Sequence, residues 1–192
     1  MNNFPVAIES VLRREGGYVN NPDDKGGETN WGISKKYHQN VDIKNLTRED
    51  AKLIYYGDYW LKNSLDKIAE QKVATATLDT VANHGSGARL IQQAINRAGG
   101  RVSVDGKIGT GTISVLNKLD PAKFLAALYV EREYKYRDLV SKDPTQTQFL
   151  KGWLARISKY KGAAEGGIVA LEGGIVPLLA VGLIAYFYMK KS

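Results

Sequence analysis

The stretch EGGYVNNPDDKGGETNWGIS, residues 15–34, determines how the rest of the chain is interpreted, because it places an acid beside a glycine- and Asp-rich loop. Upstream, apolar residues recur at three- and four-residue steps, the spacing of one helix face. Glu15 continues that spacing, and Gly16 and Gly17 predict the end of the helix. We therefore expect Glu15 in the last helical turn, on the face formed by Phe4, Ile8, Val11 and Leu12.

Such a position disfavours a negative charge on Glu15. Partial burial and the negative end of the helix dipole both favour the neutral carboxyl, which a general acid requires. Asp24 follows nine positions later, and Thr29 five after that. Two carboxyls and a hydroxyl are the groups of a glycosidase site, where one acid protonates the leaving oxygen and the other stabilises the oxocarbenium-like state or activates water. The alternative is a Glu that points to water or pairs with Arg13 or Arg14.

The same run resembles the opening motif of glycoside hydrolase family 108, the phage and bacterial N-acetylmuramidases. The resemblance implies a lysozyme-like catalytic lobe with Glu15 as the catalytic acid. By spacing, Asp24 is the second carboxylate, and the adjacent Asp23 is the open alternative. The wider phage-type lysozymes continue with Thr six residues after the Asp, a position held here by Asn30, whereas Thr29 lies one residue earlier.

Three residues around the Asp-rich loop are expected to contact the substrate: Tyr18, Asn30 and Trp31. Tyr18-Val19 and Trp31-Gly32-Ile33 predict short extended segments on either side of the loop, which form a small β-hairpin. The expected fold class is therefore mainly α, a lysozyme-like α+β arrangement with a small hairpin at the active-site loop.

Helical signals continue along the chain. Thr47 with Asp50 three positions later predicts a capping box. The helix that it opens ends near Tyr59-Trp60, and its aromatic residues are either core or sugar-stacking groups. Further helices are expected at 72–83, at 88–98, after the loop 104–109 with Thr112 as a cap, from Pro121 to Leu139, and from Phe149 to Ile157.

Four segments follow from these patterns. Residues 1–83 form the catalytic lobe, and residues 84–160 form a helical lobe that resembles the predicted peptidoglycan-binding domain of family 108 proteins. The loop 104–109 either takes part in that binding or only closes the lobe. Residues 161–167 are a small-residue linker, and residues 168–189 are a transmembrane helix.

The charge and composition of the chain limit the classes of binding partner and cofactor that are expected. The net charge of +7 and the pI near 9.4 favour an anionic partner, which for a muramidase is the bacterial cell envelope with its peptidoglycan. Nucleic acid is not expected, because the chain has no arginine-rich helix. The chain has no Cys, and His38 and His84 lie far apart, so neither a metal nor another cofactor is expected.

The C-terminal region indicates a membrane anchor. Residues 173–189 are seventeen consecutive uncharged residues, and from Ile168 about twenty apolar positions are available, enough to cross a bilayer. No signal peptide is recognisable at the N-terminus. Basic residues flank the segment on both sides and leave its orientation open: Arg156, Lys159 and Lys161 before it, Lys190 and Lys191 after it.

These observations predict a membrane-anchored, bacteriolytic peptidoglycan hydrolase, a lysozyme or endolysin that cleaves the bond between N-acetylmuramic acid and N-acetylglucosamine. The enzyme is expected in a virion inner membrane or a host cell membrane, acting on the periplasmic wall during lysis or virion entry. The alternatives are a lytic transglycosylase, which requires one acid, and a non-catalytic wall-binding or virion structural protein on a lysozyme-like fold.

Overall fold

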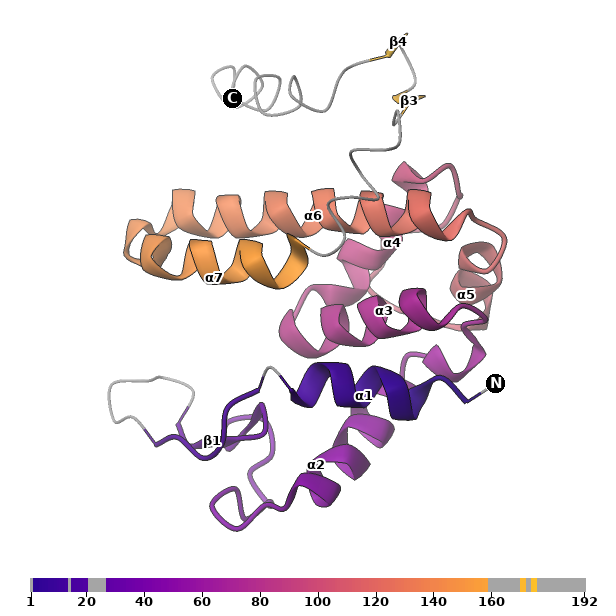
Figure 1. Ribbon diagram of the computed structural model, residues 1–192. Coiled ribbons are helices and arrows are strands. Elements are labelled where there is room, and N and C mark those ends of the chain that lie inside the picture. Colours follow the sequence, from indigo (N-terminus) through magenta and orange to yellow (C-terminus); the bar gives the residue numbers. More distant parts are fainter. Residues whose placement is uncertain (1, 14, 21–26, 159–169, 172–173, 176–192) are drawn as a thin grey trace. The chain divides into compact units, whose positions relative to one another are not determined.

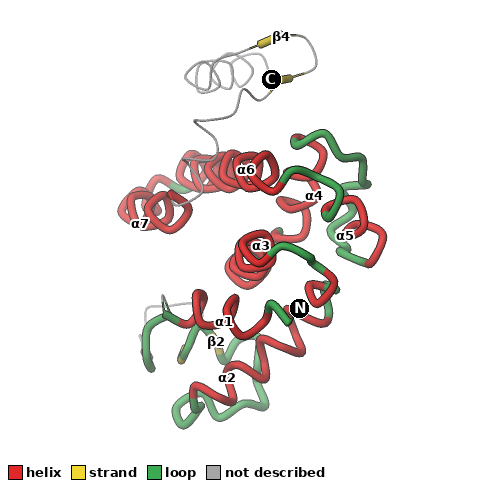
Figure 2. Tube along the Cα trace, turned by 45° about the vertical axis from the view of Figure 1, so that its right-hand side comes forward, coloured by secondary structure: helices red, strands yellow, loops and turns green. Residues whose placement is uncertain are grey.

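The protein is mainly helical, with strands of two residues each (Figures 1 and 2). The chain divides into two compact units: the first comprises Met1–Gly87 and Ile108–Ile113, and the second comprises Ala88–Lys107 and Ser114–Ser192. The expectation of a mainly α protein with a small two-stranded sheet is confirmed, but the hairpin pairs residues 29–30 with 33–34 and not the two segments expected on either side of the Asp-rich loop. The structure is a computed structural model, and it describes residues 2–13, 15–20, 27–158, 170–171 and 174–175.

The first unit is built on the packing of α1 (Phe4–Leu12) along α3 (Gln71–Asn83). The apolar spacing that predicted α1 places four of its residues in the core. Asn3, which precedes α1, donates from Nδ2 to the Ile68 carbonyl at 2.7 Å, and Gln71 Nε2 donates to the Asn3 carbonyl at 3.0 Å. The buried residues of α1 are Ala7, Ile8, Val11 and Leu12.

A second helical segment joins α2 (Arg48–Ile54) directly to the π-helical η1 (Tyr55–Leu61). The predicted capping box is confirmed, because Asp50 N donates to Thr47 Oγ1 at 3.1 Å and Thr47 N donates to an Asp50 carboxylate oxygen at 3.4 Å. Of the aromatic residues in this segment, Tyr55, Tyr56, Tyr59 and Trp60, two are buried core residues: Tyr55 and Trp60. The short η2 (Leu65–Lys67) then leads to α3.

An ion-pair network ties α1 to α2. Arg48 donates through both terminal nitrogens to the Glu9 carboxylate, at 3.0 and 2.5 Å, and Lys52 Nζ lies 3.0 Å from the same carboxylate. The hydrogen bonds from Arg48 and then Lys52 lower the pKa of Glu9 from its ordinary 4.5 to about 2. The folded chain therefore favours the ionised form of Glu9.

Acid is expected to weaken this tie. The pKa of Glu9 is lower in the folded chain, so its stabilisation is complete above pH 4.5 and is lost as the pH falls toward 2. The Glu9 side chain is 39% exposed, and solvent screening limits the effect to about 0.2–1 kcal/mol. Urea unfolding of the wild type and Glu9→Gln across this range should give a stability difference that shrinks with acid; a constant difference would contradict the assignment.

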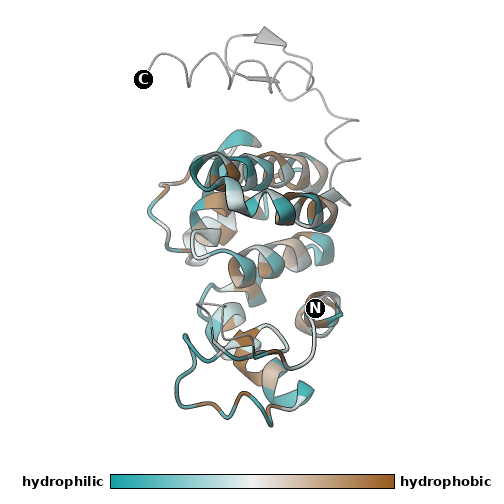
Figure 3. Ribbon diagram, turned by 90° about the vertical axis from the view of Figure 1, so that its left-hand side faces the viewer, coloured by the Kyte–Doolittle hydropathy of each residue, from teal (hydrophilic) through white to brown (hydrophobic). Residues whose placement is uncertain are grey.

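The second unit contains most of α4 (Gly87–Arg97), together with α6 (Pro121–Lys142), η3 (Pro144–Gln146) and α7 (Thr147–Ile157). The predicted start at Pro121 is confirmed, and the Asp120 side chain caps the helix by accepting from Lys123 N at 2.8 Å. Helix α7 packs on α6, where the Tyr136 and Trp153 rings stack with centroids 5.2 Å apart. Along the helices of the described chain, hydrophilic and hydrophobic residues alternate (Figure 3).

The short α5 (Thr110–Leu116) corrects one expectation. Thr112 was predicted to cap this helix, but the helix begins two residues earlier, so Thr112 lies inside it. Gly109 precedes the helix, and its carbonyl accepts from Ile113 N at 3.1 Å, which adds a first turn before Thr112.

Most of the predicted linker and membrane helix lies outside the described residues. Within 168–189 the structure describes only β3 (Ala170–Leu171) and β4 (Gly174–Ile175), which pair as antiparallel strands and at these positions differ from the predicted helix. In the described ranges, no helix combines the length and apolar character needed to cross a membrane.

Candidate active site

Glu15 lies beyond the end of α1 and not in its last turn. The helix ends at Leu12 with Arg13 as its cap, so the expectation that Gly16 and Gly17 terminate it is wrong. A longer helix would need Gly16 N–H to bond back to Leu12, and glycine in a helix costs about 1 kcal/mol relative to alanine. The chain therefore leaves the helix before the glycine pair, and Glu15 is half-buried in a bend.

The Glu15 side chain lies against the backbone of Gly32. A Cβ atom built on Gly32 would lie 3.0 Å from both Cγ and Oε2 of Glu15, and 2.5 Å from the phenol oxygen of Tyr55. The carboxyl and the phenol thus approach the same face of this glycine. Only a residue without a side chain leaves room for both groups.

Gly32 is in the turn of the small hairpin formed by β1 (Thr29–Asn30) and β2 (Ile33–Ser34). Trp31 and Gly32 are the two turn residues, with φ of 51° and 77°. Positive φ at both central residues is the requirement of a type I′ hairpin turn. The sequence predicted a hairpin but assigned Trp31 and Gly32 to an extended segment, and that assignment is wrong.

The left-handed conformation of Trp31 is supported by two contacts from the α2–η1 segment. Tyr55 Oη donates to the Trp31 carbonyl at 3.3 Å, and the Arg48 guanidinium carbon lies 6.0 Å from the Trp31 ring centroid. A non-glycine residue in this conformation is uncommon and costs about 1–2 kcal/mol. Such strain often occurs at functional sites. Tyr55 therefore touches both the turn and the region of the acid.

Asn30, expected to contact substrate, lies in the interior with 6% of its surface exposed. Its Nδ2 donates to the carbonyls of Ile43 at 3.0 Å and Leu46 at 3.2 Å. Both amide hydrogens are thereby used within the fold. The structure gives Asn30 an anchoring role that holds the hairpin against the segment before α2.

Thr29 and Tyr18 are brought together by main-chain pairing. Thr29 and Val19 exchange two backbone hydrogen bonds of 2.8 Å, which places Tyr18 next to the hairpin. Tyr18 is 40% exposed and donates to Glu28 Oε2 at 3.0 Å. Partial burial and this carboxylate raise the pKa of Tyr18. Asp23 and Asp24 lie outside the described residues.

Two further tyrosines of the first unit are Tyr59 and Tyr37. The Tyr55 and Tyr59 rings have centroids 5.2 Å apart, and burial raises the pKa of Tyr59. Tyr37, in the turn after β2, is 76% exposed, and Lys36 Nζ lies 5.6 Å from its ring centroid. Sequence reasoning identified Tyr55 and Tyr59 only as a cluster of undecided role, and it did not single out Gly32 as a site residue. The available signal for a turn was Gly32, because glycine readily takes the positive φ that a tight turn needs.

In chemical terms, a half-buried carboxyl beside a phenol can give a proton to an oxygen atom bound at the hairpin. Residues 8–85 match the family model described as Glycosyl hydrolase 108, and residues 86–158 match the one described as Predicted Peptidoglycan domain. A solved structure described as that of Brucella abortus SagA is 30% identical, with a TM-score of 0.67, and the match covers 84% of this chain and 92% of that one. No curated protein sequence matches the chain.

Proposed function

Because the chain belongs to the glycosyl hydrolase 108 family, we propose that it is a peptidoglycan muramidase with Glu15 as its general acid. A match to a glycoside hydrolase family followed by a match to a predicted peptidoglycan domain supports the bacterial wall as the substrate. The scissile bond in this proposal joins N-acetylmuramic acid to N-acetylglucosamine. We also propose that the first unit has a lysozyme-like fold.

The observation that carries the proposal is the placement of Glu15 against Gly32 and Tyr55. The carboxyl lies at the Gly32 turn, where the phenol oxygen of the buried Tyr55 also approaches, and such packing restricts its orientation, as general acid catalysis requires. Protonated Glu15 gives its proton to the glycosidic oxygen as the bond to the sugar breaks. The resulting Glu15 carboxylate later takes a proton from water.

The second carboxylate is proposed from the sequence alone. Asp24 follows Glu15 at the spacing of the wider phage-type lysozymes, with Asp23 as the alternative, and it stabilises the oxocarbenium-like sugar or activates the attacking water. Thr29 places that water or the substrate, and Tyr18 and Trp31 contact the sugar rings. Their positions beside the hairpin support these roles.

Product analysis tests the function directly. Purified protein is incubated with sacculi, and the released fragments are identified by mass spectrometry. A muramidase leaves a reducing N-acetylmuramic acid end, whereas a lytic transglycosylase leaves an anhydro-muramyl end. Glycan strands that remain uncleaved would contradict the proposal. A reducing N-acetylglucosamine end would also contradict it, because it shows cleavage of the other glycosidic bond.

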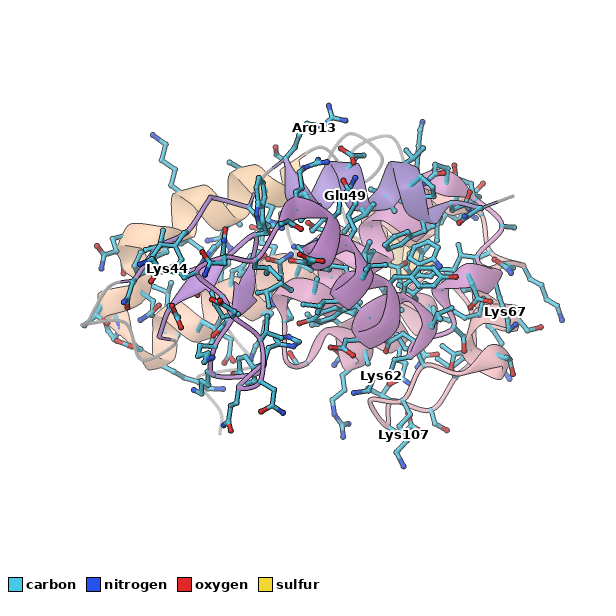
Figure 4. The ribbon with its side chains drawn as sticks, turned by 90° about the horizontal axis from the view of Figure 1, so that it is seen from below. Arg13, Lys44, Glu49, Lys62, Lys67 and Lys107 are labelled. Carbon is cyan, nitrogen blue, oxygen red and sulfur yellow. The ribbon has the colours of Figure 1, made fainter. Side chains whose placement is uncertain are left out.

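The basic charge supports approach to an anionic wall. Exposed lysines project from the first unit, Lys44, Lys62 and Lys67 among them (Figure 4). A net charge of +7 increases the local concentration of the enzyme at such a surface, in a salt-dependent way.

We further propose that residues 168–189 anchor the enzyme in a membrane, either that of a virion or that of the host cell. The uncharged run 173–189 supports this, and a phage role during lysis or entry would bring an anchored enzyme to the wall.

The anchor gives a measurable expectation. The full chain should stay in the membrane pellet after alkaline carbonate extraction, and deletion of 168–192 should move it to the supernatant with its lytic activity kept. Val181→Arg should weaken insertion by about 2.5–3.5 kcal/mol, and Val181→Leu should not. Release of the full chain by carbonate would exclude a span.

A further inference from the structure

The polar side of α4 holds the loop 102–107 in a fixed conformation. Asn96 pairs with Val102 in both directions, because Val102 N donates to Asn96 Oδ1 at 2.8 Å and Asn96 Nδ2 donates to the Val102 carbonyl at 2.9 Å. Two turns earlier on the same helix, Arg89 Nη1 donates to the Val104 carbonyl at 2.6 Å. The loop is thus bonded along its length to one helix.

Gln92 completes this clamp from the interior. It is 1% exposed, and its Nε2 donates to Asp105 Oδ1 at 2.7 Å and to the Lys107 carbonyl at 3.0 Å. Its Oε1 accepts from Gly106 N at 2.8 Å. The hydrogen bonds from Gln92 and from Lys107 N lower the pKa of Asp105. Buried, fully used amides of this kind rigidify a loop without any ligand.

A pocket of about 410 Å³ lies beside the clamped loop, entirely within the second unit. It is a shallow depression, open to solvent on one side. Its wall is preformed, because Val104 belongs to the clamped loop and the other lining residues belong to α4 and α6. The lining residues are Gln93, Asn96, Arg97, Val104 and Glu131.

An ion pair supplies both signs of charge in this pocket. Arg97 Nε donates to Glu131 Oε1 at 2.6 Å, and the two side chains are 22% and 12% exposed. Within the described part of the chain, this is the only hydrogen bond of the Arg97 guanidinium, so its terminal nitrogens can bind a second carboxylate. The guanidinium carbon lies 5.9 Å from the Tyr134 ring centroid, which helps to fix its plane.

We propose that this pocket binds the peptide stem of peptidoglycan. A stem carboxylate bonds to the Arg97 terminal nitrogens, and a stem amide N–H or ammonium bonds to Glu131 or to the Gln93 side-chain oxygen. A carboxylate and an N–H donor match an Arg–Glu pair, whereas a neutral sugar ring would be matched by an open aromatic face. The choice of the wall as ligand rests on the proposed function.

Calorimetric titration of the full-length protein with stem peptides tests this site. The peptides are released from purified sacculi by an amidase, and a second sample has its carboxyls amidated. Saturable binding is expected for the first sample only. Arg97→Gln should weaken it about tenfold, as the loss of one charge-assisted hydrogen bond predicts.

Two further variants make the test specific. Arg137→Gln is the matched control, because Arg137 also pairs with a glutamate, Glu133, but lies outside the pocket lining. Gln93→Trp fills the pocket from an exposed position and leaves the ion pair intact, so it decides the matter if Arg97→Gln misfolds.

Binding that survives Gln93→Trp, equal weakening by Arg137→Gln, or equal affinity for amidated peptides would each overturn the proposal, as would a lack of saturable binding. Glycosidic cleavage plays no part in this readout. Failure of the peptide site and failure of the muramidase assignment are therefore distinguishable, because product analysis reports only the latter.

Discussion

Replacing Glu15 with Gln is expected to slow lysis of purified sacculi by about 10²–10⁴-fold. The amide keeps the shape of the carboxyl beside Gly32 and Tyr55 but has no acidic proton to give to the leaving oxygen. The expected change is in kcat, since the substrate contacts are left in place. Turbidity loss of a sacculus suspension measures it, with product release quantified by mass spectrometry.

A matched control separates this effect from a general loss of acidic charge. Glu49→Gln removes one carboxylate from the same unit, at a position on α2 that is labelled in Figure 4. The Glu49 side chain is 76% exposed and pairs with Lys52. The lysis rate of this variant should stay near that of the wild type. If Glu15→Gln retained near-normal lysis with an unchanged circular dichroism spectrum, the assignment of the acid would be wrong.

Features with a local cause could be predicted from the sequence. The apolar spacing around Ile8 gave the buried face of α1, the Thr47–Asp50 box gave the start of α2, and Pro121 gave the start of α6. Each of these signals depends on residues within a few positions of one another. Helix periodicity and the capping of terminal N–H groups are local effects, so they can be recognised without knowing the rest of the fold.

The candidate site depends on contacts between distant residues, and there the sequence was less informative. A Trp in a left-handed turn is disfavoured by its own propensity, and its support comes from Tyr55 and Arg48, more than fifteen positions away. The extended assignment of Trp31 followed local preference and failed because tertiary contacts outweigh it. The family resemblance selected Glu15, but only the structure shows its contact with Gly32.

The loop 102–107 of the second unit also combines a feature that is local in sequence with one that depends on a distant residue. Asp105-Gly106 is a pair typical of tight turns, and Gly106 has φ of 82°. What the sequence could not show is that Gln92, more than ten positions earlier, is buried and bonds to three groups of that turn. The clamp gives the loop a structural role that is independent of ligand.

Gly32→Ala is expected to reduce lysis by about 10²-fold or more, the cost of shifting a catalytic group by roughly 1 Å. The added methyl would lie 2.5 Å from Tyr55 Oη and 3.0 Å from Glu15 Oε2, so at least one of these groups must move. The backbone contributes as well, because φ of 77° costs an alanine about 1–2 kcal/mol. Lysis rate and urea unfolding are measured on the same preparation.

Gly27→Ala separates the two causes. Gly27 has φ of 70°, close to that of Gly32, but its added methyl would meet only Lys35 Cβ, at 4.0 Å. Both variants should therefore lose similar backbone stability, whereas only Gly32→Ala should lose most of its activity. If the two variants lost activity equally, the contact between Glu15 and the hairpin turn would not position the acid, and backbone strain alone would explain the loss.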